Sequence, residues 1–192
     1  MDRRELLRIA AASAGVAGLH GLTPRQLLAF GERVHRAAGD GPLQVLDPHA
    51  AATVTAAAER ILPRTDTPGA TDAGVTAFID HMLDGWYPQS DRERFLNGLA
   101  DLDARSRARA NRDFVSLPES DQVAVLTALD DELTAFRRAR PAGQATPWFD
   151  LLKYLTVYGF CTSEAGATKA LRIWPKPFRY EPCAPLPRAR GA

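Results

Sequence analysis

The stretch WFDLLKYLTVYGF, residues 148–160, decides the fold. Its strongly polar residues are Asp150, Lys153 and Thr156, which recur every three positions and so lie on one narrow stripe of a helix. A surface helix usually shows a polar half, whereas a helix that is apolar nearly all round must be covered on most sides. Two arrangements meet this condition. The helix is central in a bundle, or one side meets the domain core and another side meets a second protein.

Four earlier segments also have the apolar spacing of helices. The first is capped by Asp47, has Pro48 at its first position and stops at Pro63. The predicted buried stripes of the four segments are Val54, Ala57, Ala58 and Ile61; Val75, Phe78, Ile79, Met82, Leu83 and Trp86; Phe95, Leu99 and Leu102; and Leu126, Leu129, Leu133 and Phe136. No alternating run is long enough to require a strand. The sequence therefore predicts an all-α fold, a small bundle of about five helices.

The composition changes along the chain and predicts four regions. Residues 1–22 form a leader, residues 23–45 a short helix and a Gly-rich linker, residues 46–162 the helical bundle, and residues 163–192 an extended C-terminal strap. The polar end of the third bundle helix, residues 103–112, is expected to be solvated. Prolines exclude a helix or a central strand in the strap: Pro175, Pro177, Pro182, Pro185 and Pro187.

The leader has the features of a bacterial export signal. Arg3 and Arg4 form a twin-arginine pair, and an uncharged stretch rich in Ala and Gly follows at residues 9–19. That stretch is too short to span a bilayer, which needs about 20 apolar residues. We therefore expect export by the twin-arginine (Tat) route to the periplasm. The alternative is an ordinary amphipathic helix with two surface arginines, and signal cleavage is left open.

Overall composition excludes several classes of function. The chain has 192 residues, which suits one domain with short appendages, and its net charge is +1. No overall field attracts nucleic acid or acidic lipid. Basic and aromatic residues alternate in the strap, as in platforms for single-stranded nucleic acid, but the frequent prolines disfavour that use. Two cysteines, Cys161 and Cys183, are too few for a four-ligand zinc site or a disulfide scaffold.

The residue patterns give no catalytic, cofactor-binding or metal-binding set. None of the four histidines belongs to an HExxH motif, and the sequence has no GxGxxG, Walker or GxSxG motif. Asx-turns account for Asp66 and Asp72 in the loop at residues 64–74 better than a calcium site does. We therefore expect that the chain is not an enzyme by itself. The alternative is a free-standing periplasmic helical enzyme or sensor that uses this loop and His81.

An extended strap cannot bury its own aromatic side chains. Trp174, Phe178 and Tyr180 must pack on the helices of this domain or on another chain. Large aromatic residues with nearby arginines are typical of the anchors of protein interfaces. The residue pattern alone does not decide between the two surfaces.

Two stretches resemble the gluconate 2-dehydrogenase subunit 3 family. They are RILPRTDTPGATDAGVTAFID, residues 60–80, and LKYLTVYGFCTSEAGATKALRIWPKPFRYEPC, residues 152–183; the leader and SLPESDQ, residues 116–122, fit as well. The resemblance implies a small, helical, non-catalytic subunit of a bacterial flavin-dependent sugar or polyol dehydrogenase. The implied partner is a large FAD-bearing catalytic subunit of the glucose-methanol-choline type. A multi-haem cytochrome c often completes such complexes, so membrane association would be indirect.

The resemblance also implies what the unusual segments do. A small subunit with a twin-arginine signal co-exports a folded, FAD-loaded partner that lacks its own signal, and this chain binds no cofactor. Ser163 and Glu164 then shape a turn that aims the strap. The implied partner interface is Trp148, Tyr154, Tyr158, Ser163, Glu164, Arg172, Trp174, Phe178, Arg179 and Tyr180. A transient maturation chaperone for the catalytic subunit is the alternative with the same fold.

The two cysteines differ in how well they fit the family. Cys183 matches a cysteine expected there, whereas the position of Cys161 more usually holds an aromatic residue, and Trp174 is also atypical. Three states stay open: a Cys161–Cys183 disulfide, a bond from Cys183 to the catalytic subunit after export, and two free thiols.

Overall fold

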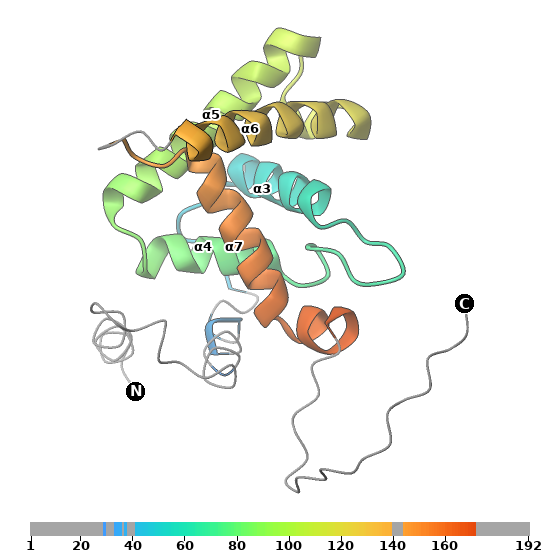
Figure 1. The fold of residues 1–192 in the computed structure, drawn as a ribbon. Helices are drawn as coiled ribbons and strands as arrows, with labels where there is room; N and C mark the ends of the chain where they lie inside the picture. Colours follow the sequence, from blue (N-terminus) through green and yellow to red (C-terminus); the bar gives the residue numbers. More distant parts are fainter. Residues whose placement is uncertain (1–28, 30–32, 36, 38–40, 140–143, 172–192) are drawn as a thin grey trace, which may run out of the picture.

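The computed structural model describes residues 29, 33–35, 37, 41–139 and 144–171, and these residues form an all-α bundle without strands, as predicted (Figure 1). The helices are α3 (Pro48–Ile61), α4 (Val75–Gly85), α5 (Gln89–Ala110), α6 (Glu119–Ala139) and α7 (Trp148–Thr162). A 3-10 turn, η1 (Phe114–Ser116), links α5 to α6, and a π-helix, η2 (Ala165–Ala170), follows α7. No helix among the described residues is both long and apolar enough to cross a membrane.

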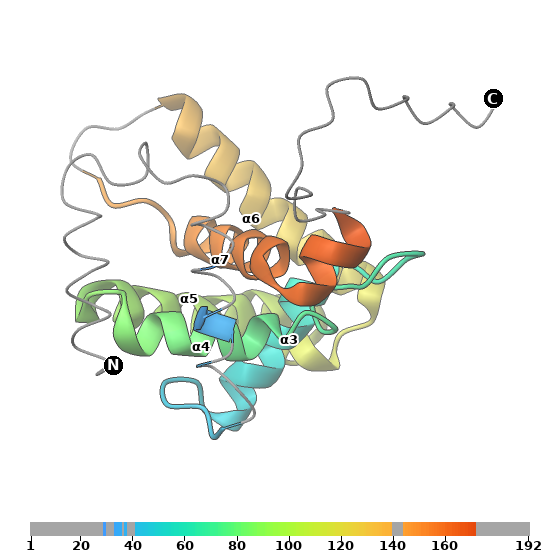
Figure 2. The same cartoon turned by 90° about the horizontal axis from the view of Figure 1, so that it is seen from below.

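Helix α7 is the central helix of the bundle. It contacts α3, α4, α5 and α6, and Figure 2 shows it between α6 and α4. Phe149, Leu152, Leu155 and Phe160 are buried on it. The prediction of a central helix is therefore confirmed. One strip of α7 remains at the surface, and its contact with a second protein stays a prediction.

The predicted stripes of the other helices supply much of the rest of the core. Ile61, Trp86 and Phe136, at the ends of these stripes, are partly buried. The buried members are Val54, Ala57 and Ala58; Val75, Phe78, Ile79, Met82 and Leu83; Phe95, Leu99 and Leu102; and Leu126, Leu129 and Leu133.

The start of α3 agrees with its predicted cap. Asp47 Oδ1 accepts a hydrogen bond from the backbone N–H of Ala50 at 2.8 Å, and Pro48 occupies the first turn. The helix ends at Ile61, before Pro63.

Asp80 on α4 fixes the segment that enters the bundle. Its side chain is buried and accepts three backbone hydrogen bonds, from Gln44 at 2.8 Å, Val45 at 2.9 Å and Leu46 at 2.8 Å. A buried carboxylate needs such donors to replace its water. These bonds hold Leu46 in the core, where the sequence predicted the bundle to begin.

The end of α5 differs from the prediction that residues 103–112 are solvated. Asp103 and Ser106 are buried, because η1 folds back onto this part of α5 and the backbone N–H of Phe114 donates to Asp103 Oδ1 at 2.9 Å. The prediction of solvation was therefore wrong for these two side chains.

The C-terminal boundary also differs in detail. The extended strap was predicted to begin at residue 163, but the chain makes a π-helical turn through Ala170. Within the described residues, an extended conformation therefore does not begin directly after α7. The leader, and the strap from residue 172 onward, lie outside the described residues.

Candidate partner interface

The outward strip of α7 exposes apolar and aromatic side chains. Tyr154 is 52% exposed and Val157 is 44% exposed, and Tyr158, one position further along the chain, is half-buried beside them. Residues three and four apart share one face of a helix, so these three side chains form a continuous surface. We refer to Tyr154, Val157 and Tyr158 as the outer face of α7. Leu171, at the end of η2, is a further exposed apolar residue.

The two tyrosines of this face lie close together. The rings of Tyr154 and Tyr158 stack with their centroids 5.7 Å apart, and Tyr158 meets Phe78 edge-on at 5.6 Å. Burial raises the pKa of Tyr158, with the nearby Tyr154 adding to the effect. Burial, with smaller contributions from Tyr154, Asp91 and Tyr158, raises the pKa of Tyr87 to about 12. Tyrosines, with an apolar ring and one polar tip, are enriched at protein interfaces.

The polar residues of α7 connect it to the rest of the bundle. Lys153 pairs with Asp130, and Asp150 pairs with Arg137, both on α6. Thr156, the third member of the polar stripe, is fully buried. The stripe therefore faces α6 and the core, which leaves the outer face of α7 free of ionic groups from that stripe.

Trp148, predicted as an interface residue, packs α7 against α5. Its ring meets Phe95 edge-on with centroids 6.2 Å apart. It covers Gly98, where an added Cβ would lie 2.0 Å from the indole. The indole is partly exposed, so its structural role leaves part of the ring at the surface.

The Ser-Glu-Ala-Gly turn after α7 is built by hydrogen bonds of Ser163. Its hydroxyl donates to the Phe160 carbonyl at 2.8 Å and accepts from the Gly166 N–H at 2.9 Å. A Cβ at residue 166 would lie 1.9 Å from the Phe160 carbonyl oxygen, so this turn requires glycine. Ser163 is buried within the turn, whereas Glu164 is exposed. The turn places η2 next to the loop at residues 64–74 (Figures 1 and 2).

His35, which the sequence placed in the linker, contacts the inner side of the same helix. Its Nε2 donates to the Gly159 carbonyl at 2.7 Å, and its ring stacks on Phe78 with centroids 4.8 Å apart. Burial lowers the pKa of His35, and the bond to Gly159 partly opposes this. Phe78 thus lies between His35 and Tyr158. No local signal marked this contact, because the hydrogen bond joins residues that are 124 positions apart.

The loop at residues 64–74 is held by carboxylates that serve the fold. Glu59 accepts hydrogen bonds from the backbone N–H of Arg64 at 2.9 Å and from the N–H and hydroxyl of Thr71 at 2.9 and 2.7 Å. Asp72 pairs with Arg64 and accepts from the Gly69 N–H at 2.9 Å. Because this donor lies three residues before Asp72, the bond is not the Asx-turn that was predicted, in which the side chain accepts from a residue further along the chain. Burial acts to raise the pKa of Glu59, but the bonds from Thr71 and Arg64 bring it below its usual value. In the described part of the chain, no three His, Cys, Asp or Glu side chains are placed to hold a metal ion.

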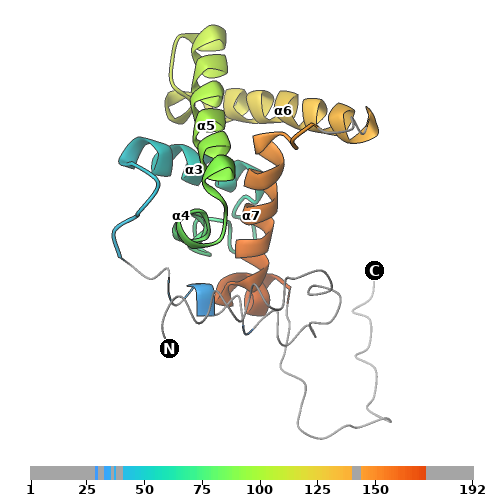
Figure 3. The ribbon, with the colours of Figure 1, turned by 90° about the vertical axis from the view of Figure 1, so that its left-hand side faces the viewer.

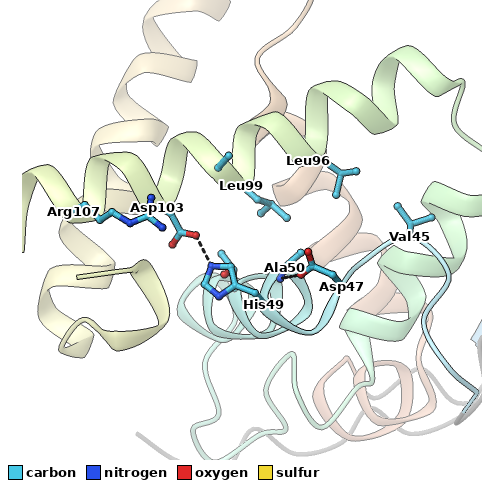
Figure 4. Close-up of a pocket in the computed structure, with 10 residues that line it drawn as sticks. Val45, Asp47, His49, Ala50, Leu96, Leu99, Asp103 and Arg107 are labelled. Atoms are coloured by element: carbon cyan, nitrogen blue, oxygen red, sulfur yellow. Dashed lines mark hydrogen bonds and ion pairs between the residues drawn. The ribbon is translucent and has the colours of Figure 1, made fainter. Parts of the chain in front are cut away.

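A second feature, missed in the sequence, is a cavity of about 310 Å³ between α3 and α5 (Figure 4). At one end His49 Nε2 lies 2.6 Å from Asp103 Oδ2. The hydrogen bond to the buried Asp103 raises the pKa of His49, and burial opposes it. The two residues are 54 positions apart, so sequence spacing could not pair them.

Several predicted residues lie outside the described residues: Arg3, Arg4, Arg172, Trp174, Phe178, Arg179, Tyr180 and Cys183. Cys161 is half-buried on α7, and burial raises the pKa of its thiol. Its pairing with Cys183 stays a prediction.

Comparison with protein families identifies the family of this chain. The family model described as Gluconate 2-dehydrogenase subunit 3 matches residues 48–182. The matched range runs from the first residue of α3, through α7 and η2, into the strap. The chain has no significant match among curated proteins or among solved structures.

Proposed function

Because the chain belongs to the gluconate 2-dehydrogenase subunit 3 family, we propose that it is a non-catalytic small subunit of a bacterial flavin-dependent sugar or polyol dehydrogenase. It binds and stabilises a large catalytic subunit of the glucose-methanol-choline type, and that subunit carries the FAD. Family membership is the observation that carries this proposal. A multi-haem cytochrome c is the further component through which such a complex would reach the membrane.

The outer face of α7 supports the proposal as the contact surface. It consists of two tyrosines and a valine, and Tyr158 connects it to the core through Phe78. Rigid tyrosines bury a large area on binding while losing little side-chain entropy, which favours them as anchors. Covering Tyr154 and Val157 would also remove the exposed apolar area that the isolated chain leaves in water.

The strap extends this interface in our proposal. The described chain ends at the exposed Leu171, just after the turn built by Ser163. Trp174, Phe178 and Tyr180, with Arg172 and Arg179, follow within a few residues and supply the interface anchors. The rigid turn sets the direction in which the strap leaves the bundle.

The leader gives the subunit its second role. We place Arg3 and Arg4 in a twin-arginine signal that exports the assembled complex to the periplasm. Residues 34 and 35 are packed in the bundle, with Val34 buried and His35 bonded to α7. This contact connects the region after the leader directly to the helix that carries the outer face.

The test is co-purification of this chain from its own cells with a large FAD-bearing subunit. Tyr154→Glu places a charge in the centre of the outer face and should weaken the complex at least about 30-fold, the effect of losing a binding hot spot. Val123→Glu is the matched control, because Val123 is 47% exposed on α6 and lies outside the outer face of α7. Complexes that survive both substitutions equally would refute this surface assignment.

Stoichiometry separates the permanent subunit from the maturation chaperone. A fixed one-to-one ratio in the finished, periplasmic dehydrogenase is expected for a subunit. Loss of the chain once FAD is loaded and export is complete would identify a chaperone instead.

A further inference from the structure

The described residues that precede the bundle attach the N-terminal part of the chain to the end of α7. Val34 is buried, and His35 Nε2 donates to the carbonyl of Gly159 at 2.7 Å. Thr162 Oγ1 lies 3.4 Å from the same nitrogen. Figure 3 shows this segment, in blue, below α4 and beside the C-terminal end of α7. Toward its N-terminus, the chain therefore leaves the bundle next to α7.

This point of departure is close to the outer face of α7. The ring of His35 stacks on Phe78 with centroids 4.8 Å apart, and Tyr158 meets the same ring edge-on at 5.6 Å. Phe78 is fully buried, so its position is fixed by the core. One phenylalanine ring thus connects the segment that follows the leader to a tyrosine of the outer face.

The outer face gains from any apolar cover. Tyr154 is 52% exposed and Val157 is 44% exposed, and removing such side chains from water is favourable. Until a catalytic subunit binds, the nearest source of cover is an apolar segment of the chain itself.

The leader has a suitable apolar segment. Residues 9–19 carry no charge, and their larger side chains recur at helical spacing on one side: Ile9, Ala12, Val16 and Leu19. As a helix, this side is about 15 Å long. It is therefore long enough to cover the outer face, whose residues span only about one helical turn of α7.

The connection between the two is also long enough. The 13 residues from 20 to 32 span about 20 Å as a helix and up to about 45 Å when extended. Helix α7, with 15 residues, is about 22 Å long. A short tether gives an effective concentration in the mM range. A leader that binds the outer face with a Kd of only about 1 mM would thus be bound at least half of the time.

We infer that residues 9–19 of the leader cover the outer face of α7 in the isolated chain, and that the catalytic subunit displaces them when it binds. Arg3 and Arg4 then become accessible for export only after assembly. The identity of the displacing partner rests on the proposed function, whereas the contact between the leader and α7 does not.

Trypsin cleavage after Arg8 tests the contact in the purified full-length chain, with mass spectrometry of the N-terminal peptides. Tyr154→Glu places a charge in the contact, so it should release the leader and speed cleavage about two- to fivefold, the range set by the effective concentration. Val123→Glu is the matched control, because Val123 is 47% exposed on α6. It should leave the rate unchanged.

A photoreactive phenylalanine at position 154 gives a second measurement, which does not depend on a disruptive substitution in the bundle. In the purified chain it should crosslink to residues 9–19. Val16→Asp should lower the yield of this crosslink severalfold. Ala14→Asp is the matched control, because residue 14 lies on the opposite side of the predicted leader helix, and it should leave the yield unchanged.

The possible outcomes separate this inference from the proposed function. Equal cleavage rates in wild type, Tyr154→Glu and Val123→Glu, or no crosslink from position 154 to the leader, would overturn the inference. The proposed function would still stand if Tyr154→Glu weakens the complex with a FAD-bearing subunit. A leader contact in a chain that never co-purifies with such a subunit would support the inference and contradict the proposed function.

Discussion

Replacing Asp80 by asparagine should destabilise the bundle strongly, although it removes no apolar contact. The carboxylate of Asp80 accepts the backbone N–H groups of Gln44, Val45 and Leu46, at 2.8, 2.9 and 2.8 Å. Oδ1 holds Val45 and Leu46, and Oδ2 holds Gln44. An asparagine has one acceptor oxygen, so it can keep at most the Oδ1 pair, and its amide group then opposes the Gln44 N–H.

The expected magnitude follows from those bonds. Loss of one charge-assisted bond, with a donor left unsatisfied, costs about 1.5–3 kcal/mol. For a chain of this length the loss corresponds to a fall in Tm of roughly 3–12 °C. Urea unfolding followed by circular dichroism measures the free energy, and a thermal scan measures Tm.

Asp131→Asn on α6 is the control, because Asp131 is exposed there. It should change the free energy of unfolding by less than about 0.5 kcal/mol. If Asp80→Asn matches that control, the three bonds do not hold the entry segment, and the explanation given for the start of the bundle is wrong.

Further predictions concern the His49 pair, the turn and the core. The bond to Asp103 raises the pKa of His49. The bond therefore stabilises the folded protein fully at pH values below the pKa of histidine in the unfolded chain, about 6.5. This stabilisation is lost as pH rises through the folded pKa. The difference in the free energy of unfolding between wild type and His49→Gln, measured by urea unfolding, should therefore be larger at pH 5.5 than at pH 8.5. An equal difference at the two pH values would contradict the pairing. Gly166→Ala brings a Cβ within 1.9 Å of the Phe160 carbonyl oxygen and should cost about 1–3 kcal/mol in urea unfolding, whereas an unchanged midpoint would show that the turn adapts. Leu152→Ala empties a fully buried site on α7 and should cost about 2–5 kcal/mol in the same assay, and a smaller loss would argue against a central α7.

Local periodicity predicted the helices well, because a helix that buries one face needs apolar residues three and four positions apart. Leu152 and Leu155 face the core on a helix whose narrow polar stripe already required cover on most sides. The cap at Asp47 was also predictable, since the capping bond to Ala50 is local.

Contacts between distant residues could not be predicted in this way. Asp103 lies in a run that reads as solvated, and its burial depends on η1 and on His49, which is 54 positions away. The same limit applies to His35 on Gly159. The outer face of α7 was predicted only in part. The apolar sequence of the helix indicated that other parts of the protein or a partner cover most of its sides, but periodicity could not tell which side remains exposed.

The central claim is that the outer face of α7 contacts a flavin-bearing catalytic subunit. Site-specific photocrosslinking in cells tests it most directly, with a photoreactive phenylalanine at position 154 or, as control, at position 123. A crosslink from position 154 to a large FAD-containing chain, and none from position 123, is the predicted result. Equal crosslinking from both positions, or no crosslink from position 154 in a complex that still co-purifies, would contradict the claim.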